Sequence, residues 1–114
     1  MAVTYFVRMR ALEGNEAAVE EVLLSNMERI RRGERGNLAF AVHRSREDTR
    51  EFWLYETWTD VEAVEAHESG AEFKAYKERL RPLVEPDSVL FGDTEPLGAL
   101  GYELPGHPDR ASAA

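Results

Sequence analysis

The sequence contains no cysteine among its 114 residues, so disulfide bonds and thiolate metal sites are excluded. Long apolar runs are also missing: the longest stretches without a charged residue, such as 2–7 and 36–43, span only six to eight residues. A membrane-spanning helix needs about 20 apolar residues, and Arg8 comes too early for the apolar core of a secretory signal. We therefore expect no membrane interaction and a cytoplasmic location.

Positive charge is scarce as well. The 14 Lys and Arg residues against 22 Asp and Glu residues give a formal net charge of −8. This charge repels phosphate backbones, and no basic stripe interleaved with aromatic residues offsets it, so we expect no nucleic-acid partner. The length suits one domain, and 43% apolar with 32% charged residues is typical of a folded globular chain.

Signatures of metals and cofactors are absent from the sequence. The three histidines, His43, His67 and His107, are too widely spaced for a metal site, and no H-E-x-x-H pattern occurs. There is no G-x-G-x-x-G segment for a dinucleotide and no G-x-S-x-G segment for a serine nucleophile. We therefore expect no metal, no organic cofactor and no serine hydrolase chemistry.

The spacing of apolar residues predicts an alternation of strands and helices. Helical periodicity from Val19 to Ile30 predicts a helix over 15–33, with Asn15 as its N-cap and Gly33 at its end. Two S/T-x-x-E capping boxes, at 59–62 and 69–72, predict a short helix and then a longer one that ends near Pro82. Strands are predicted over 3–10, 38–43, 51–58 and 89–91, with 97–102 as a further candidate.

This order of elements is typical of an α+β fold of the ferredoxin-like βαββαβ type, an antiparallel sheet with helices on one face. We expect residues 1–95 to form that domain. Residues 96–114 would then be a C-terminal extension, with the candidate strand followed by a mobile tail that has too little apolar surface to bury.

Two of the predicted strands are apolar on both faces. In strand 51–58, Phe52, Leu54 and Trp58 alternate with Trp53 and Tyr55, and in strand 3–10 Phe6 lies opposite a second apolar face. Helices on one face of a sheet leave the other face open. The aromatic side chains on that open face would be exposed to water unless another structure covers them. A second copy of the chain is the favoured cover, because most oligomers are symmetric homodimers. The alternatives are half-covered surface aromatics or burial beneath residues 97–104.

Several short segments make the chain resemble the antibiotic biosynthesis monooxygenase (ABM) domain family. They are the opening strand, the turn at Gly14, and the segments ERGNL (34–38), LYETW (54–58), EAH (65–67) and FKAY (73–76). The resemblance implies a dimeric α+β barrel in which two ferredoxin-like sheets face each other. Members of the family include cofactor-independent monooxygenases of quinols and polyketide anthrones, haem-degrading proteins, isomerases of small signalling molecules and proteins of no known activity.

Three titratable residues are the candidates for catalysis. His67 can exchange a proton near neutral pH, although it could instead only terminate its helix. Glu56 stands on an otherwise apolar strand face, where burial would raise its pKa and make it a base; a structural anchor is the alternative. The hydroxyl of Tyr76 could orient an oxyanion. The candidates for substrate binding, all of which could equally be core or surface residues, are Trp58, Phe73, Phe6 and Tyr55.

These expectations combine into one favoured function. Cofactor-free oxygenation needs a phenolic or enolic substrate whose anion passes an electron to O₂, together with a water-poor aromatic pocket and a proton acceptor. We therefore expect a homodimeric monooxygenase that acts on a small aromatic, quinol or polyketide-like substrate. The expected process is antibiotic biosynthesis. A cofactor-free isomerase of a small carbonyl compound and a non-catalytic ligand-binding module are the alternatives.

Overall fold

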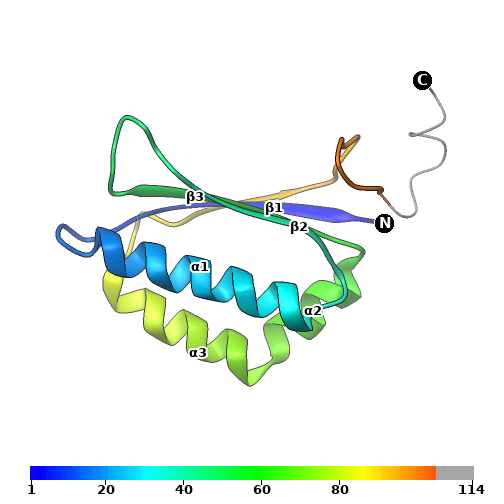
Figure 1. Ribbon diagram of the computed structural model, residues 1–114, viewed down its shortest axis with the longest axis horizontal. Helices are drawn as coiled ribbons and strands as arrows, with labels where there is room; N and C mark the ends of the chain where they lie inside the picture. Colours follow the sequence, from blue (N-terminus) through cyan, green and yellow to red (C-terminus); the bar gives the residue numbers. More distant parts are fainter. Residues whose placement is uncertain (105–114) are drawn as a thin grey trace.

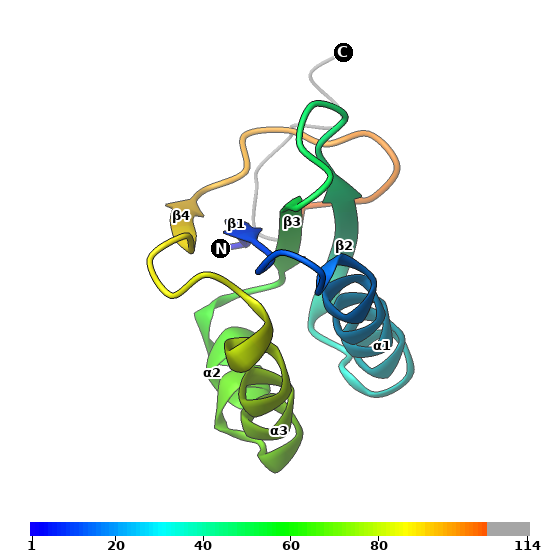
Figure 2. The ribbon, with the colours of Figure 1, turned by 90° about the vertical axis from the view of Figure 1, so that its left-hand side faces the viewer.

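The computed structural model describes residues 1–104, which form one four-stranded antiparallel sheet in the order β2-β3-β1-β4 with helices against one face (Figure 1, Figure 2). The predicted α+β ferredoxin-like class is therefore confirmed. In chain order the elements are β1 (Val3–Arg10), α1 (Glu16–Gly33), β2 (Asn37–Arg44), β3 (Glu51–Trp58), α2 (Val61–Ser69), α3 (Ala71–Leu80), the 3₁₀ turn η1 (Arg81–Leu83) and β4 (Leu90–Thr94).

The pleat of the strands sorts the side chains between two faces. Val7 of β1 is paired with Leu54 of β3, and both side chains lie on the helix side of the sheet. The adjacent pair, Phe6 and Tyr55, therefore lies on the side that carries no helix. The predicted division of both strands into two faces is correct, and β1 is central because it also pairs with β4.

The helix side of the sheet holds the hydrophobic core in two clusters. One is centred on Met9, Leu23 and Phe52, and the other consists of Ile30, Trp58 and Val64. Both clusters depend on α1, whose buried residues recur at helical spacing over 18 residues. In the part of the chain that the structure describes, no helix is long and apolar enough to cross a membrane.

The helix starts differ in detail from the sequence prediction. The N-cap of α2 is Asp60 rather than Thr59, and its carboxylate accepts the backbone N–H of Ala63 at 2.8 Å. At α3 the cap is Gly70, since the Ser69 hydroxyl bonds back to the Ala66 carbonyl oxygen. Asn15 caps α1 without a side-chain hydrogen bond. At α2 the sequence pattern selected Thr59, but Asp60 is the next residue and a carboxylate is an equally good N-cap. The prediction was therefore off by one residue.

Glycine permits one close approach near these helices. A Cβ atom at Gly36, between α1 and β2, would collide with the side chain of Ala63 in α2. The absence of a side chain at position 36 thus lets the loop pack against α2. The end of α3 agrees with the prediction, since the helix stops at Leu80 and Pro82 sits in the following 3₁₀ turn.

The segment after β4 crosses the open face of the sheet without forming a strand (Figure 2). The further candidate strand at 97–102 is therefore not formed within the single chain. The hydroxyls of Tyr102 and Thr57 lie 3.3 Å apart, which places the segment over the end of β3, whereas Trp53 further along β3 remains 44% exposed. The predicted mobile tail, residues 105–114, lies outside the described residues.

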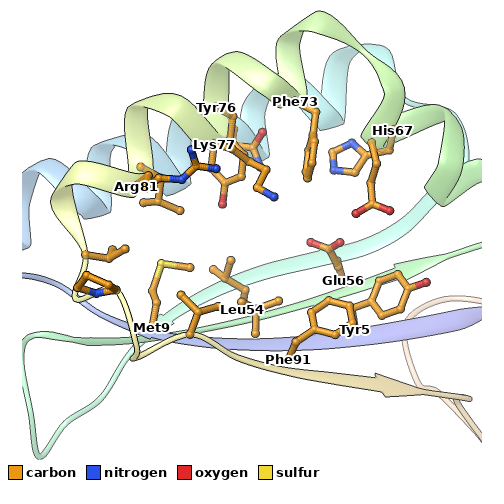
Figure 3. A pocket seen from close by; sticks show the side chains of 17 residues that line it. Tyr5, Met9, Leu54, Glu56, His67, Phe73, Tyr76, Lys77, Arg81 and Phe91 are labelled. Carbon is orange, nitrogen blue, oxygen red and sulfur yellow. The ribbon is translucent and has the colours of Figure 1, made fainter.

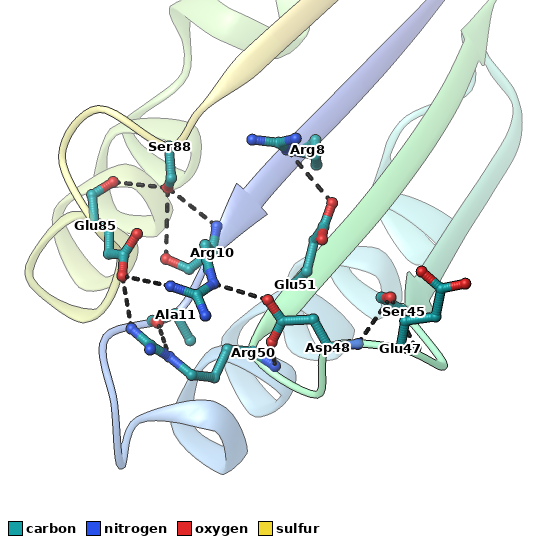
Figure 4. A network of polar contacts seen from close by, with 10 residues as sticks. All are labelled: Arg8, Arg10, Ala11, Ser45, Glu47, Asp48, Arg50, Glu51, Glu85 and Ser88. Carbon is teal, nitrogen blue, oxygen red and sulfur yellow. Dashed lines mark hydrogen bonds and ion pairs between the residues drawn. The ribbon is translucent and has the colours of Figure 1, made fainter.

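A polar network fastens the hairpin between β2 and β3 to the segment that precedes β4 (Figure 4). Arg10 donates to Asp48 at 2.8 Å and to Glu85 at 3.1 Å, and Arg50 donates to Glu85 at 2.6 Å. The backbone N–H of Arg50 and then the Arg10 guanidinium hold the pKa of Asp48 below its usual range. This network fixes the residues around Val84 against the end of β1.

Candidate functional site

A cavity of about 470 Å³ lies between the sheet and the pair of helices α2 and α3 (Figure 3). Its sheet wall is mostly apolar, whereas its helix wall carries aromatic and titratable groups. The lining residues are Tyr5, Val7, Met9, Asn26, Leu54, Glu56, His67, Glu68, Phe73, Tyr76, Lys77, Leu80, Arg81, Val84, Pro86, Val89 and Phe91. The volume lies within the range of small-molecule sites.

Glu56 rises from the sheet into this cavity because it shares the inward face of β3 with Leu54 and Trp58. Burial raises the pKa of Glu56 to about 7, and the charges of Glu68 and Glu34 act in the same direction. The indole N–H of Trp58 donates to the Glu56 carboxylate at 3.2 Å and opposes part of that rise. A carboxyl group with this pKa can both accept and return a proton near neutral pH.

His67 faces Glu56 from the opposite wall, near the end of α2 (Figure 3). Its Nδ1 atom lies 2.8 and 2.7 Å from the two carboxylate oxygens of Glu34, and its side chain is almost fully buried. Because a carboxylate only accepts hydrogen bonds, Nδ1 carries the proton in this pair. In the neutral ring Nε2 is then the free base, which is the arrangement of a histidine prepared for proton transfer.

Aromatic rings hold the His67 imidazole in place. The ring of Trp58 lies 4.6 Å from it between centroids, and the ring of Phe73 meets it edge-on at 4.8 Å. Trp58 is 1% exposed and does not line the cavity itself. It contacts both Glu56 and His67, so it orients the two titratable groups from behind.

Two tyrosines, Tyr76 and Tyr5, line the cavity. Burial raises the pKa of Tyr76 above its ordinary value, and the negative charge of Glu56 adds to the rise. The pKa of Tyr5 is raised by burial and then by the charge of Asp93. Both hydroxyls therefore stay protonated near neutral pH, and that of Tyr76 can donate a hydrogen bond to an oxyanion in the cavity.

The structure brings together four of the seven residues that the sequence analysis selected. His67, Glu56, Tyr76 and Phe73 all line the cavity, and Trp58 lies directly behind it. Phe6 and Tyr55 do not belong to this group, because they stack on each other on the open face with ring centroids 6.1 Å apart. Side chains alternate between the two faces of a strand. Phe6 therefore lies on the face opposite to the cavity.

Several further polar residues of the site were not selected from the sequence, among them Lys77, Arg81 and Glu34. Lys77 and Arg81 line the cavity from α3 and η1, and their four-residue spacing after Phe73 could have indicated a shared helix face. Glu34 gave no comparable signal, since it lies 33 residues from His67 and only the fold joins them. Within residues 1–104, no group of His, Asp and Glu is arranged to hold a metal ion.

Comparison with known proteins gives one family match and several solved structures of the same fold. Residues 2–79 match the family described as antibiotic biosynthesis monooxygenase. No curated protein matches the sequence.

Three solved structures illustrate the shared fold. A Chloroflexus aurantiacus J-10-fl protein, named provisionally as an antibiotic biosynthesis monooxygenase, is 22% identical with a TM-score of 0.78 over 90% of this chain and 100% of its own. PA3566 from Pseudomonas aeruginosa is 25% identical, with a TM-score of 0.75 over 85% of this chain and 95% of its own. A variant of SnoaB, a cofactor-independent oxygenase from Streptomyces nogalater, is 20% identical, with a TM-score of 0.74 over 88% and 97%. The family match covers more than half of the sequence, and the chain belongs to the antibiotic biosynthesis monooxygenase family.

Proposed function

We propose that the protein is a cofactor-independent monooxygenase of a small aromatic, quinol or polyketide-like substrate, and that the cavity beneath α2 and α3 is its substrate site. One observation carries the proposal: Glu56 and His67 line opposite walls at the same end of the cavity, and Glu34 is hydrogen-bonded to Nδ1 of His67. SnoaB, which shares the fold, is described as a cofactor-independent oxygenase, and this supports the proposed reaction.

The first step is removal of a proton from the substrate. An enolisable C–H or phenolic O–H placed between Glu56 and His67 gives its proton to the Glu56 carboxylate or to Nε2 of His67. The resulting oxyanion accepts a hydrogen bond from the Tyr76 hydroxyl, which remains protonated. Such preorganised donors stabilise charge where it develops.

Oxygen then reacts with the substrate anion. The anion transfers one electron to O₂, and the substrate radical and superoxide combine to form a C–O bond. The peroxide takes up the proton that Glu56 or His67 removed, and the O–O bond breaks as the carbon loses its second hydrogen. One oxygen atom leaves as water and the other stays as a new carbonyl, so the substrate loses two hydrogens and gains one oxygen.

The open face of the sheet supports the second part of the proposal, a homodimer. Phe6 is 47% exposed, Trp53 is 44% exposed and Leu90 is 54% exposed, all on the side without helices. Each buried aromatic can remove about 150–250 Å² from water, so a partner sheet here gains substantial hydrophobic free energy. We also propose a cytoplasmic location, a domain spanning 1–95 and an extension spanning 96–114.

Oxygen consumption tests the proposed reaction. Purified protein is mixed with an anthrone or a hydroquinone, and O₂ uptake is compared with spontaneous autoxidation. We expect Glu56→Gln and His67→Gln to lower the enzymatic rate by about 10²–10⁴-fold, the usual contribution of an acid–base group. Glu65→Gln and His43→Gln are the matched controls, because both residues lie outside the cavity.

The same proton-transfer pair favours one second candidate, a cofactor-free isomerase of a small carbonyl compound. Isomerisation would need Glu56 and His67 but not O₂. Turnover of a carbonyl substrate that persists under nitrogen would identify the isomerase. If none of these substrates reacts in air or under nitrogen, a non-catalytic binding module becomes the better reading.

A further inference from the structure

Two cations stand on the helix wall of the cavity, away from the end occupied by His67. Phe73, Lys77 and Arg81 follow one another at four-residue intervals, so each lies about 6 Å further along the helix axis than the last. Arg81 keeps a helical backbone conformation, so this spacing continues to its position. Figure 3 shows Lys77 reaching into the gap between helix and sheet, with Arg81 beyond it.

Neither cation has a carboxylate partner in the described part of the chain. Several other arginines do: Arg10 is paired with Asp48 and Glu85, and Arg44 with Glu20. No ion pair within 4.0 Å joins Lys77 or Arg81 to Glu56, Glu68 or any other acid of residues 1–104. Both residues are exposed to solvent, so their charged groups are open to an anionic ligand that enters the cavity they line.

The surfaces next to the cations are apolar. The ammonium of Lys77 lies 5.6 Å from the centroid of the Phe73 ring, in cation–π range. Across the cavity the sheet presents Met9, Leu54 and Phe91. A ligand that fills this part must therefore combine a flat apolar body with a negative charge on the side of α3.

We propose that Lys77 and Arg81 form a binding site for the carboxylate of a planar aromatic acid, which orients the substrate with its reactive ring toward Glu56 and His67. This rests on the proposed function for the identity of the reactive end. The carboxyl groups of Glu56 and Glu68 line the same cavity. They repel a singly charged carboxylate less than a doubly charged phosphate, which is why we assign a carboxylate.

Binding of two matched probes tests the site without catalysis. Anthraquinone carboxylate and anthraquinone carboxamide have nearly the same shape and differ in charge, and neither needs to react. We expect the carboxylate to bind at least about tenfold more tightly, the usual effect of a charge-assisted hydrogen bond. Lys77→Gln and Arg81→Gln should each weaken carboxylate binding about tenfold and leave carboxamide binding unchanged.

Two control variants remove the same charges elsewhere on α3. Lys74 does not line the cavity, and Arg79 faces a separate surface hollow beside α1, so Lys74→Gln and Arg79→Gln should bind both probes as the parent protein does. Equal affinity for the two probes, no binding of the carboxylate, or equal losses in the control variants would overturn the anion site. Oxygen uptake with a neutral hydroquinone, measured on the same preparations, reports separately on the proposed function.

Discussion

Both carboxylate oxygens of Glu34 lie within 2.8 Å of Nδ1 of His67, although the two residues come from the C-terminal ends of two different helices. Glu34 follows α1 and His67 lies in the last turn of α2. Arg29 approaches the same carboxylate at 3.7 Å. The contact fixes which nitrogen of His67 carries the proton and points Nε2 away from Glu34.

Replacing Glu34 should therefore impair proton transfer by His67, although Glu34 itself does not line the cavity. We expect Glu34→Ala to lower kcat by about tenfold to a hundredfold, the usual cost of losing a group that orients a functional histidine. Nitrogen NMR of labelled His67 checks the cause, since the signature of protonated Nδ1 should weaken in the variant. Glu72→Ala is the control, because Glu72 also pairs with Arg29 but makes no hydrogen bond to His67. An unchanged kcat and an unchanged His67 spectrum would remove Glu34 from the site.

The pH dependence of the reaction should follow Glu56. Its pKa is raised to about 7, so the carboxylate that serves as base forms only as the pH approaches and passes neutrality. We expect kcat/KM to rise with pH with an inflection near that value, and Glu56→Gln to abolish the inflection. A profile that keeps the same inflection in Glu56→Gln would show that another group is responsible.

Trp58 should shift that inflection. Its indole N–H donates to the Glu56 carboxylate and favours the charged form, so Trp58→Phe should move the inflection of kcat/KM to higher pH. Trp53→Phe is the matched control, since Trp53 lies on the open face and has no contact with Glu56. An inflection that stays in place in Trp58→Phe would mean that the hydrogen bond does not control Glu56.

The same carboxyl group makes stability depend on pH in a direction opposite to most carboxylates. Between about pH 4.5 and 7 the folded protein retains the Glu56 proton while the unfolded chain loses it, so the free energy of unfolding falls as the pH rises. The shift corresponds to about 3 kcal/mol. Urea unfolding at about pH 5 and pH 8 should therefore show Glu56→Gln gaining stability over the parent at the higher pH. Glu65→Gln, on the exposed side of α2, should show no such gain.

Much of the fold could be predicted from the sequence because it depends on local periodicity. Alternation in β1 and β3 and the helical spacing of α1 each have one consistent solution, and the topology follows from their order. The candidate strand at 97–102 is not formed within the single chain, because this segment leaves the edge at β4 and crosses the open face, where its backbone does not run along a strand edge.

The site could be predicted only in part, for a related reason. Glu56 and His67 were recognisable because each is a titratable residue within an apolar pattern. Their support by Glu34 depends on a contact between the end of α1 and α2, which no local pattern encodes. The alternation of side chains predicted that Phe6 and Tyr55 share one face of the sheet. It could not predict that the cavity lies on the other face.

The exposed rings of that open face lead to the last prediction, on assembly. If a second copy covers the sheet, Trp53→Glu places a charge in the buried centre of the interface and should convert a dimer to a folded monomer at micromolar concentration. Leu24→Glu is the control: Leu24 is similarly exposed, at 40% against 44%, but lies on α1 behind the opposite face. Sedimentation equilibrium measures the mass of each, and circular dichroism checks that each is folded. A parent protein that sediments as a monomer would contradict the homodimer and leave Trp53 as an ordinary surface residue.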